Sequence, residues 1–183
     1  RRDVDVRVVQ RIGGRGDLGA RRCYENGLRR DPALAGRVAV RFLILANGDV
    51  VTGGGFLVAG GSPANRIARW DGTAWYALGA GANGIVDALI SHPSGDVVAG
   101  GRFTSPGNRI ARWNGTAWSI MSGMNGNVKC LATMLNGDIV AGGQFTTAGG
   151  VSARIARWNG SSWSAVGSGI TGSVNAMIVT PND

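Results

Sequence analysis

Short apolar runs separated by glycine-rich turns dominate the chain from about residue 43 onward. Val86-Asp-Ala-Leu89 is one such run, and Val97-Val-Ala-Gly-Gly101 is another that follows a Gly-Asp turn. Short runs that are rich in Val and Ile and bounded by Gly, Asn or Asp predict β-strands. The sequence has no apolar run of about 18 residues or more, so we expect no membrane-spanning helix.

A ten-residue motif occurs three times and organises these runs into a repeat. The copies are Arg66 to Trp75 (RIARWDGTAW), Arg109 to Trp118 (RIARWNGTAW) and Arg154 to Trp163 (RIARWNGSSW). Each repeat divides into four predicted strands, and an Asp-Gly or Asn-Gly pair separates the third strand from the fourth. Such pairs favour a hairpin turn because both central residues can take a positive φ.

Four strands in a repeat of about 40–50 residues are typical of one blade of a β-propeller. We therefore expect a mainly β fold with three four-stranded blades, at about residues 43–85, 86–127 and 128–173. Residues 174–183 repeat only the first strand of a blade. Because propellers usually contain about four to eight blades, we expect either a longer array or association between copies. In a two-fold dimer with six blades, each terminal strand would complete the partner's first blade.

The repeat resembles a kelch-like, galactose-oxidase-type family of propeller repeats in secreted bacterial proteins. Gly137 to Gly150 (GDIVAGGQFTTAGG) and Ser168 to Gly172 (SGITG) carry the resemblance, which covers about residues 43–183. It implies a periplasmic, extracellular or cell-surface protein. A galactose-oxidase-like copper site needs His and Tyr ligands, and the chain has only His92, Tyr24 and Tyr76. We therefore expect neither a metal nor another cofactor.

The first 42 residues follow a different pattern, which predicts a short α/β segment ahead of the propeller. Val4 to Ile12 reads as a strand or short amphipathic element, and Arg37 to Ile44 reads as a strand. Leu18 to Arg30 is helical in composition despite Gly27, and Asp31-Pro32 would end that helix. So short a segment buries little apolar surface by itself, and we expect it to be partly ordered, or ordered only by packing on the propeller.

This segment resembles the TonB-like C-terminal domain of gliding-motility (AgmX-type) periplasmic proteins. Arg22-Cys-Tyr-Glu25 and Leu28 to Val38 carry the resemblance, which spans about residues 4–48. The further strand and second cysteine that the family would place after Gly48 are replaced by repeat sequence. This departure argues against a TonB-like energy-transduction contact, and it leaves open that the chain is a recombined or engineered chimera.

The join between the two patterns falls between Arg41 and Gly48. Leu43 corresponds to Ile90 and Ile178 of the first strands of the repeats, whereas Arg41 stands where those strands have small residues. An arginine is a poor fit to a propeller core position. We therefore expect the strand from Val38 to Ala46 to be the one that another copy's Val174 to Pro181 displaces.

The net charge of +8 is concentrated at the N-terminus, where residues 1–48 hold eleven Arg against five acidic residues. A basic arm can bind nucleic acid or anionic lipid, but we expect these arginines to be solvated and no nucleic-acid partner. Gly14 to Gly19 (GRGDLG) fits a dinucleotide-binding pattern. Because no acidic residue ends the next predicted strand, a flexible loop is the better interpretation. Cys23 and Cys130 form no disulfide or metal framework.

The repeated arginines and tryptophans are the candidate ligand-binding residues. The tryptophans could stack on sugars, but we expect them to pack between blades, where one indole buries about 150–250 Å². The arginines could bind an anion or an acidic glycan, or they could pair with Asp96 and Asp138. The six candidates are Arg66, Arg109, Arg154, Trp75, Trp118 and Trp163.

Residues with catalytic chemistry are scarce in this sequence. It has one histidine, His92, and neither a clustered carboxylate pair nor a Ser/His/Asp set. We therefore expect a non-enzymatic scaffold or interaction module of an exported bacterial protein. A lectin-like or acidic-ligand receptor is the alternative, and a chimera without a native function is the second alternative.

Overall fold

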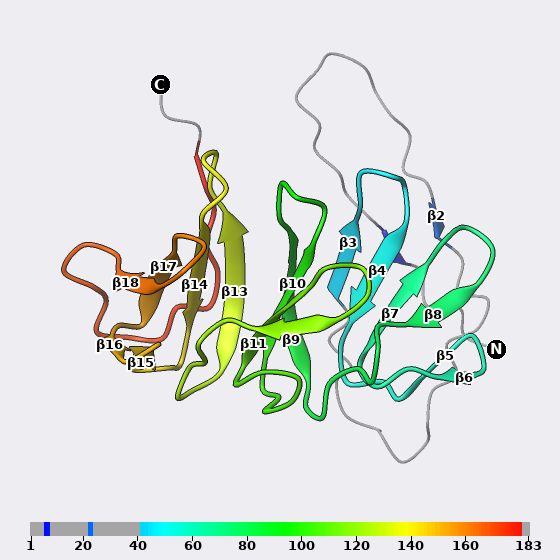
Figure 1. Cartoon of the computed structure of the whole chain (residues 1–183), viewed down its shortest axis with the longest axis horizontal. Helices are drawn as coiled ribbons and strands as arrows, with labels where there is room; N and C mark the ends of the chain where they lie inside the picture. The colour runs from blue at the N-terminus through cyan, green and yellow to red at the C-terminus, as the bar shows by residue number, and fades with distance from the viewer. Residues whose placement is uncertain (1–5, 8–21, 24–40, 181–183) are drawn as a thin grey trace.

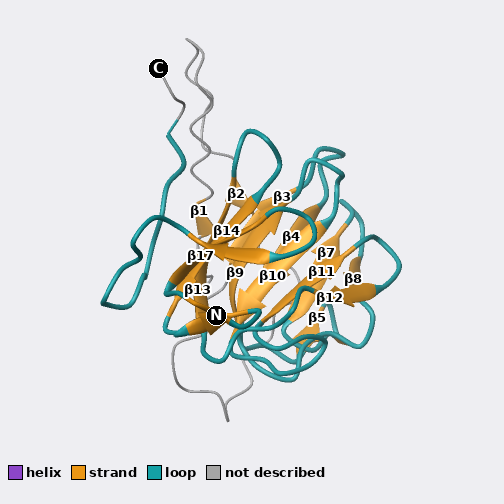
Figure 2. Ribbon diagram, turned by 60° about the vertical axis from the view of Figure 1, so that its left-hand side comes forward, coloured by secondary structure: helices purple, strands orange, loops and turns teal. Residues whose placement is uncertain are grey.

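The computed structural model describes residues 6–7, 22–23 and 41–180, and every regular element among them is a β-strand. Figure 2 shows strands joined by loops, without a helix in the described part. Three four-stranded antiparallel sheets lie side by side in chain order (Figure 1). The described chain is thus all-β with blade-like repeats, as the repeat pattern predicted.

The three sheets have the same meander order, in which each strand pairs with the next core strand along the chain. The first sheet contains β3 (Arg41–Ile44), β4 (Val50–Gly53), β7 (Ile67–Trp70) and β8 (Trp75–Ala77). The second contains β9 (Val86–Ser91), β10 (Val97–Gly101), β11 (Ile110–Trp113) and β12 (Trp118–Ile120). The third contains β13 (Val128–Thr133), β14 (Ile139–Gly143), β17 (Ile155–Trp158) and β18 (Trp163–Ala165).

Two small hairpins account for the difference in length between the repeats. The first sheet carries β5 (Val58–Ala59) and β6 (Ser62–Pro63), and the third carries β15 (Thr147–Ala148) and β16 (Val151–Ser152). Both glycines at each hairpin tip have positive φ values, 59° and 83° in the first sheet and 53° and 89° in the third. This is the backbone of a two-residue hairpin turn. The sequence pattern did not predict these strands.

The turn between the third and fourth strands is a hairpin, as predicted, but it forms by another mechanism. Gly72 has a φ of 99°, whereas Asp71 is not among the residues with positive φ. Instead, an oxygen of the Asp71 carboxylate accepts hydrogen bonds from the amides of Thr73 and Ala74. Asn114 and Asn159 make the same contacts in the other sheets. The Asx side chain therefore holds the turn.

We call the contact between two consecutive sheets a seam. In each seam a glycine, which has no side chain, lets the two sheets approach closely. A Cβ atom at Gly100 of β10 would lie 2.5 Å from Val128 Cγ1 of the next sheet, and one at Gly53 would lie 2.6 Å from Val86 Cγ1. The first strand of each following sheet therefore rests directly on the backbone of the sheet before it. We call the first strand of each sheet, β3, β9 or β13, its inner strand. The inner strand β9 consequently lies between β3 and β13 (Figure 1).

The core fills the space between neighbouring sheets. One buried cluster joins the second and third sheets and includes Ile110, Val128 and Phe145. Another joins the first and second sheets and includes Ile67, Val86 and Phe103. Apolar contacts therefore link each sheet mainly to its sequence neighbours, as in other repeat architectures.

The first sheet contains two residues that do not fit the repeat. Arg41 opposes Gly53 in the position that Ala88 and Cys130 hold in the other sheets, so the predicted alignment is confirmed. Its side chain is exposed, and its Nε donates to the Asp87 carbonyl at 2.8 Å. Thr52 is fully buried, and its hydroxyl has no hydrogen-bond partner in the described part of the chain.

Ahead of β3, four residues of the N-terminal segment are described. β1 (Val6–Arg7) pairs antiparallel with β2 (Arg22–Cys23). The predicted helix is therefore wrong at Arg22 and Cys23, where strand pairing replaces it. Short isolated helices are marginal without tertiary packing, and the glycines that flank this stretch have low helix propensity. The rest of the predicted strand and helix, the GRGDLG motif and residues 37–40 lie outside the described residues.

Residues 174–180 take the position of a first strand, but they form no strand. The Val174 amide donates to the Gly143 carbonyl at 3.1 Å, and a Cβ at Gly142 would lie 2.7 Å from Val174 Cγ1 and 2.8 Å from Met177 Cε. These contacts repeat the two internal seams. The predicted strand is wrong over 174–180 because no second strand lies beside this segment among the described residues. Residues 181–183 lie outside the described part.

Candidate functional site

The six tryptophans form three cross-strand pairs at equivalent positions. Trp70 opposes Trp75 in the register of β7 and β8, and their ring centroids lie 5.5 Å apart at 47°. The other two pairs, Trp113 with Trp118 and Trp158 with Trp163, have centroid distances of 5.3 Å. Tilted aromatic pairs of this kind stabilise neighbouring strands.

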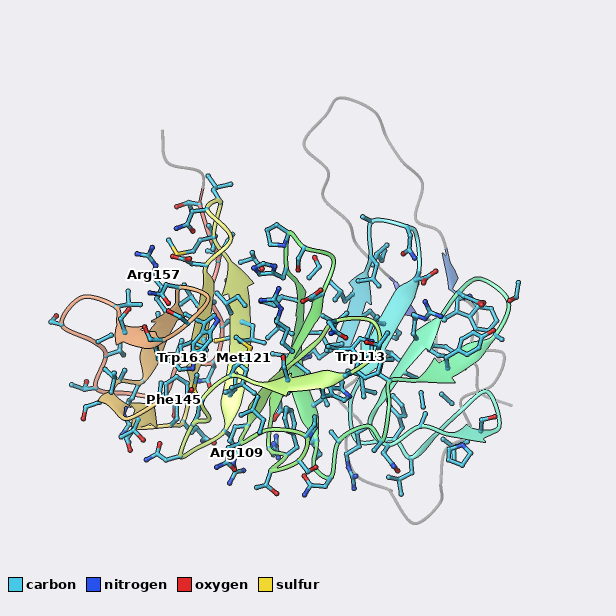
Figure 3. All side chains as sticks on the ribbon, viewed as in Figure 1. Arg109, Trp113, Met121, Phe145, Arg157 and Trp163 are labelled. Atoms are coloured by element: carbon cyan, nitrogen blue, oxygen red, sulfur yellow. The ribbon has the colours of Figure 1, made fainter. Side chains whose placement is uncertain are left out.

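The second tryptophan of a pair also connects its sheet to the sheet before it. The Trp118 indole donates to the Leu78 carbonyl at 2.8 Å, and the Trp163 indole donates to the Met121 carbonyl at 2.6 Å. Figure 3 shows Trp163 beside Met121. Trp75 donates to no acceptor among the described residues. Packing between sheets, the interpretation favoured from the sequence, thus describes Trp118 and Trp163.

The first arginine of the motif binds backbone at two of its three positions. The Arg66 guanidinium donates to the Ala82 carbonyl at 2.9 Å. Arg109 donates to the Arg102 carbonyl and to the Asn127 side chain, from the lower edge of the molecule in Figure 3. Both have a positive φ, 64° and 69°, which is rare for a residue with a side chain. Arg154 is half-buried. Arg66 and Arg109 therefore have structural partners in their seams.

The second arginine of the motif forms the ion pair that the sequence suggested. Arg112 pairs with Asp96, and Arg157 pairs with Asp138. The first sheet adds a pair between Arg69 and Asp49 at 3.0 Å, which the sequence interpretation had not included. The Asn136 amide and then the Arg157 guanidinium hold the pKa of Asp138 below its usual value. Each pair ties the second strand of its sheet to the third.

The candidate ligand-binding residues do not converge on one place within a sheet. In the first sheet, Arg66 precedes β7, whereas Trp75 opposes Trp70 at the far end of that strand. A four-residue strand between them corresponds to a rise of about 10 Å. The same spacing recurs in the other two sheets, because the motif and the register are the same.

An open pocket of about 300 Å³ lies at the seam between the second and third sheets. Its wall includes His92 from the β9–β10 turn, Asp138 at the start of β14, and Trp158 at the end of β17. The His92 Nδ1 already contacts the Ser94 hydroxyl at 2.8 Å, and Asp138 already pairs with Arg157. Sequence reasoning did not bring these residues together, because they come from three different turns.

Other chemical groups in the described residues are dispersed. No three His, Cys, Asp or Glu side chains within the described ranges are grouped as metal ligands. Burial raises the pKa of the Cys130 thiol, which lies beside the Val174 carbonyl. The described part also contains no helix long and apolar enough to cross a membrane.

Comparison with known proteins assigns no family. No family model matches the chain, and neither a curated protein nor a solved structure matches it.

The most distinctive surface lies beyond the third sheet, and we call it the end face. It comprises the exposed apolar residues Val166 and Ile170, which follow β18, and Ile178 of the terminal segment. Val166 and Ile170 follow Trp163 at the spacing at which Leu78 and Ala82 follow Trp75. Val166 is 37% exposed and Ile170 49%, whereas Leu78 and Ala82 are 3% and 4% exposed. The end face thus has the composition of a seam, and no sheet among the described residues covers it.

Proposed function

We propose that this chain is a non-enzymatic β-propeller module that associates with another copy of itself through the end face. The observation that carries the proposal is the exposure of Val166 and Ile170 at positions that are buried in both internal seams. In the second sheet, the equivalent residues Met121 and Met124 are each 2% exposed. Exposed apolar surface that would be buried in a repeat interface favours association.

Closure of a ring supports a second copy as the occupant. Three sheets are fewer than the four to eight blades that a propeller usually contains, so a ring would be completed by a longer array or by a second copy, and two copies would supply six. The resemblance to kelch-like repeats of secreted bacterial proteins supports the same architecture and an exported location. In that setting, the assembled ring would act as a scaffold or interaction surface.

Substitutions at the end face test the proposal. We expect Val166→Asp combined with Ile170→Asp to shift the mass in solution from twice 18.8 kDa toward 18.8 kDa, because two charges would have to be buried in the contact. Light scattering measures this mass. Ile120→Asp is the matched control, because Ile120 is equally apolar and 69% exposed on β12 of the middle sheet. An unchanged dimer in the end-face variant would contradict the proposal.

A further inference from the structure

Residues 174–179 have the side-chain pattern of an inner strand. Val174 and Met177 contact Gly142, in the way that Val86 and Leu89 contact Gly53 across the first seam. This segment is therefore already seated on the third sheet as the inner strand of a further sheet. The positions correspond as Val174 to Val86 and Val128, Ala176 to Ala88 and Cys130, and Met177 to Leu89 and Leu131.

The outer edge of this segment is open. Ile178 is 84% exposed and Ala176 is exposed, whereas the equivalent Ala88 of β9 is buried. The segment pairs with no strand among the described residues. An extended apolar segment with unpaired backbone groups is a template for another strand. Its natural partner is the second strand of a blade, because β10 and β14 occupy that position beside β9 and β13.

In the first sheet, the strand beside β4 is the poorest inner strand of the three. β3 contains four residues, whereas β9 and β13 contain six each. Its Arg41 and Ile44 are exposed, and Arg41 opposes Gly53 where the other sheets have Ala88 and Cys130. Ala176 would restore a small residue opposite Gly53. Replacing β3 by the terminal segment would thus exchange the four residue pairs that β3 makes with β4 for a pairing like the five residue pairs that β9 and β13 each make with their second strands.

The Trp75 indole of the first sheet is suited to donate a hydrogen bond to a backbone carbonyl of the end face. Trp118 donates to the Leu78 carbonyl, which also accepts the Gly81 amide. The Val166 carbonyl accepts the Gly169 amide in the same turn, and no indole among the described residues donates to it. Trp75, the counterpart of Trp118, has no acceptor among the described residues. A first sheet that follows the third sheet of another copy would place Trp75 beside Val166.

We infer that two copies exchange strands: residues 174–179 of each chain pair with β4 of the partner copy and take the place of β3 there. This inference rests on the proposed function, since it specifies how the end face is covered. The pairing follows the register of the internal sheets. Because Ser91 opposes Val97 and Ile44 opposes Val50, Val179 of one copy lies opposite Val50 of the other. Directly opposed Cα atoms in antiparallel strands are about 4.5–5.5 Å apart, within reach of a disulfide.

Two cysteine pairs test the exchange, both in the full chain with Cys23→Ser and Cys130→Ala. We expect Val50→Cys with Val179→Cys to form a covalent dimer under oxidising conditions. We expect Ile44→Cys with Val50→Cys, which would be opposed if β3 remained in place, to form no disulfide within the chain. The two species separate by mass on non-reducing electrophoresis. Formation of the intrachain disulfide together with failure of the intermolecular one would overturn strand exchange.

The native chain provides a measurement that does not depend on variants. Strand exchange predicts that the amides of residues 175–179 are protected from hydrogen exchange in the dimer and lose this protection at least tenfold on dilution to the monomer. Unprotected amides in a chain that light scattering shows to be dimeric would overturn the exchange and leave the proposed function in place. A monomeric mass at every concentration would overturn both.

Discussion

The seam between the second and third sheets and the end face beyond the third sheet are built from equivalent residues, but only the seam is covered. Met121 is buried against the third sheet and its carbonyl accepts the Trp163 indole, whereas Val166 is exposed and its carbonyl accepts no indole among the described residues. Equivalent repeat positions are therefore buried in the seam and exposed on the end face. In a repeat fold, the neighbour decides how much a residue contributes to stability.

The largest expected difference in unfolding free energy between the seam and the end face is at the equivalent glycines Gly100 and Gly142. We expect Gly100→Ala to reduce the free energy of unfolding by about 1–3 kcal/mol, because its Cβ would lie 2.5 Å from Val128 Cγ1 inside a packed seam. Gly142→Ala, made with Cys130→Ala because Cys130 Sγ would lie 2.9 Å from the new Cβ, should cost less, since Val174 and Met177 belong to a segment that is bound on one side and can shift. Urea denaturation of dilute, monomeric protein compares the two. Equal losses would contradict the difference between seam and end face.

The tryptophans give the next largest contrast. Trp163→Phe leaves the Met121 carbonyl without its indole donor and should cost about 1–3 kcal/mol. Trp75→Phe is the matched variant. It loses part of the ring that packs on Trp70 but no indole hydrogen bond, so it should cost the dilute monomer less than Trp163→Phe does while weakening the dimer by roughly tenfold. Denaturation measures the first effect, and a dilution series in light scattering measures the second. A dimer unaffected by Trp75→Phe would show that this indole does not reach Val166.

A substitution at Thr52 should stabilise the first sheet by making it more similar to the other two sheets. Its buried hydroxyl has no partner, and Ala99 and Ala141 hold the equivalent positions. We expect Thr52→Val to raise the free energy of unfolding by about 1 kcal/mol, because the substitution removes an unsatisfied polar group and nearly keeps the shape. Ala99→Thr is the reverse control and should destabilise. A loss of stability in Thr52→Val, measured by thermal unfolding, would mean that the hydroxyl has an acceptor.

The smallest expected effect is the pH dependence of the stability that the Asp138 carboxylate contributes. Asn136 and Arg157 lower the pKa of Asp138, so the ionised carboxylate stabilises the fold above the unfolded-state pKa, about 3.9. This contribution is lost as the pH falls through the lower pKa of the folded state. Asp138→Asn should therefore be less stable than the native chain at about pH 7, and the difference should shrink below about pH 4. A difference in melting temperature that stays constant between these pH values would contradict the assignment.

The repeated sheets could be predicted from the sequence because their signals are local. The spacing of Trp70, Trp113 and Trp158 and the Gly-Asp turns specify four strands per repeat. The alignment of Arg41 with Ala88 and Cys130 also followed from the sequence. These features depend on the residues of one sheet.

Features that depend on a neighbouring sheet could not be predicted. The positive φ of Arg66 and its bond to the Ala82 carbonyl require the chain beyond β8. The pocket beside His92 requires three turns to meet at one seam. The helix prediction failed at Arg22 and Cys23 because backbone pairing with β1 outweighs a weak local preference. The sequence indicated an incomplete blade at residues 174–183, but it did not indicate the exposure of Val166 and Ile170, since both look like any other repeat position.

The mass of the unmodified chain in solution tests the central claim, that the end face binds a second copy of the chain. Light scattering of the 183-residue chain over a dilution series measures it directly. The account predicts a mass of twice 18.8 kDa that falls toward 18.8 kDa on dilution. A mass of 18.8 kDa at every concentration would contradict it.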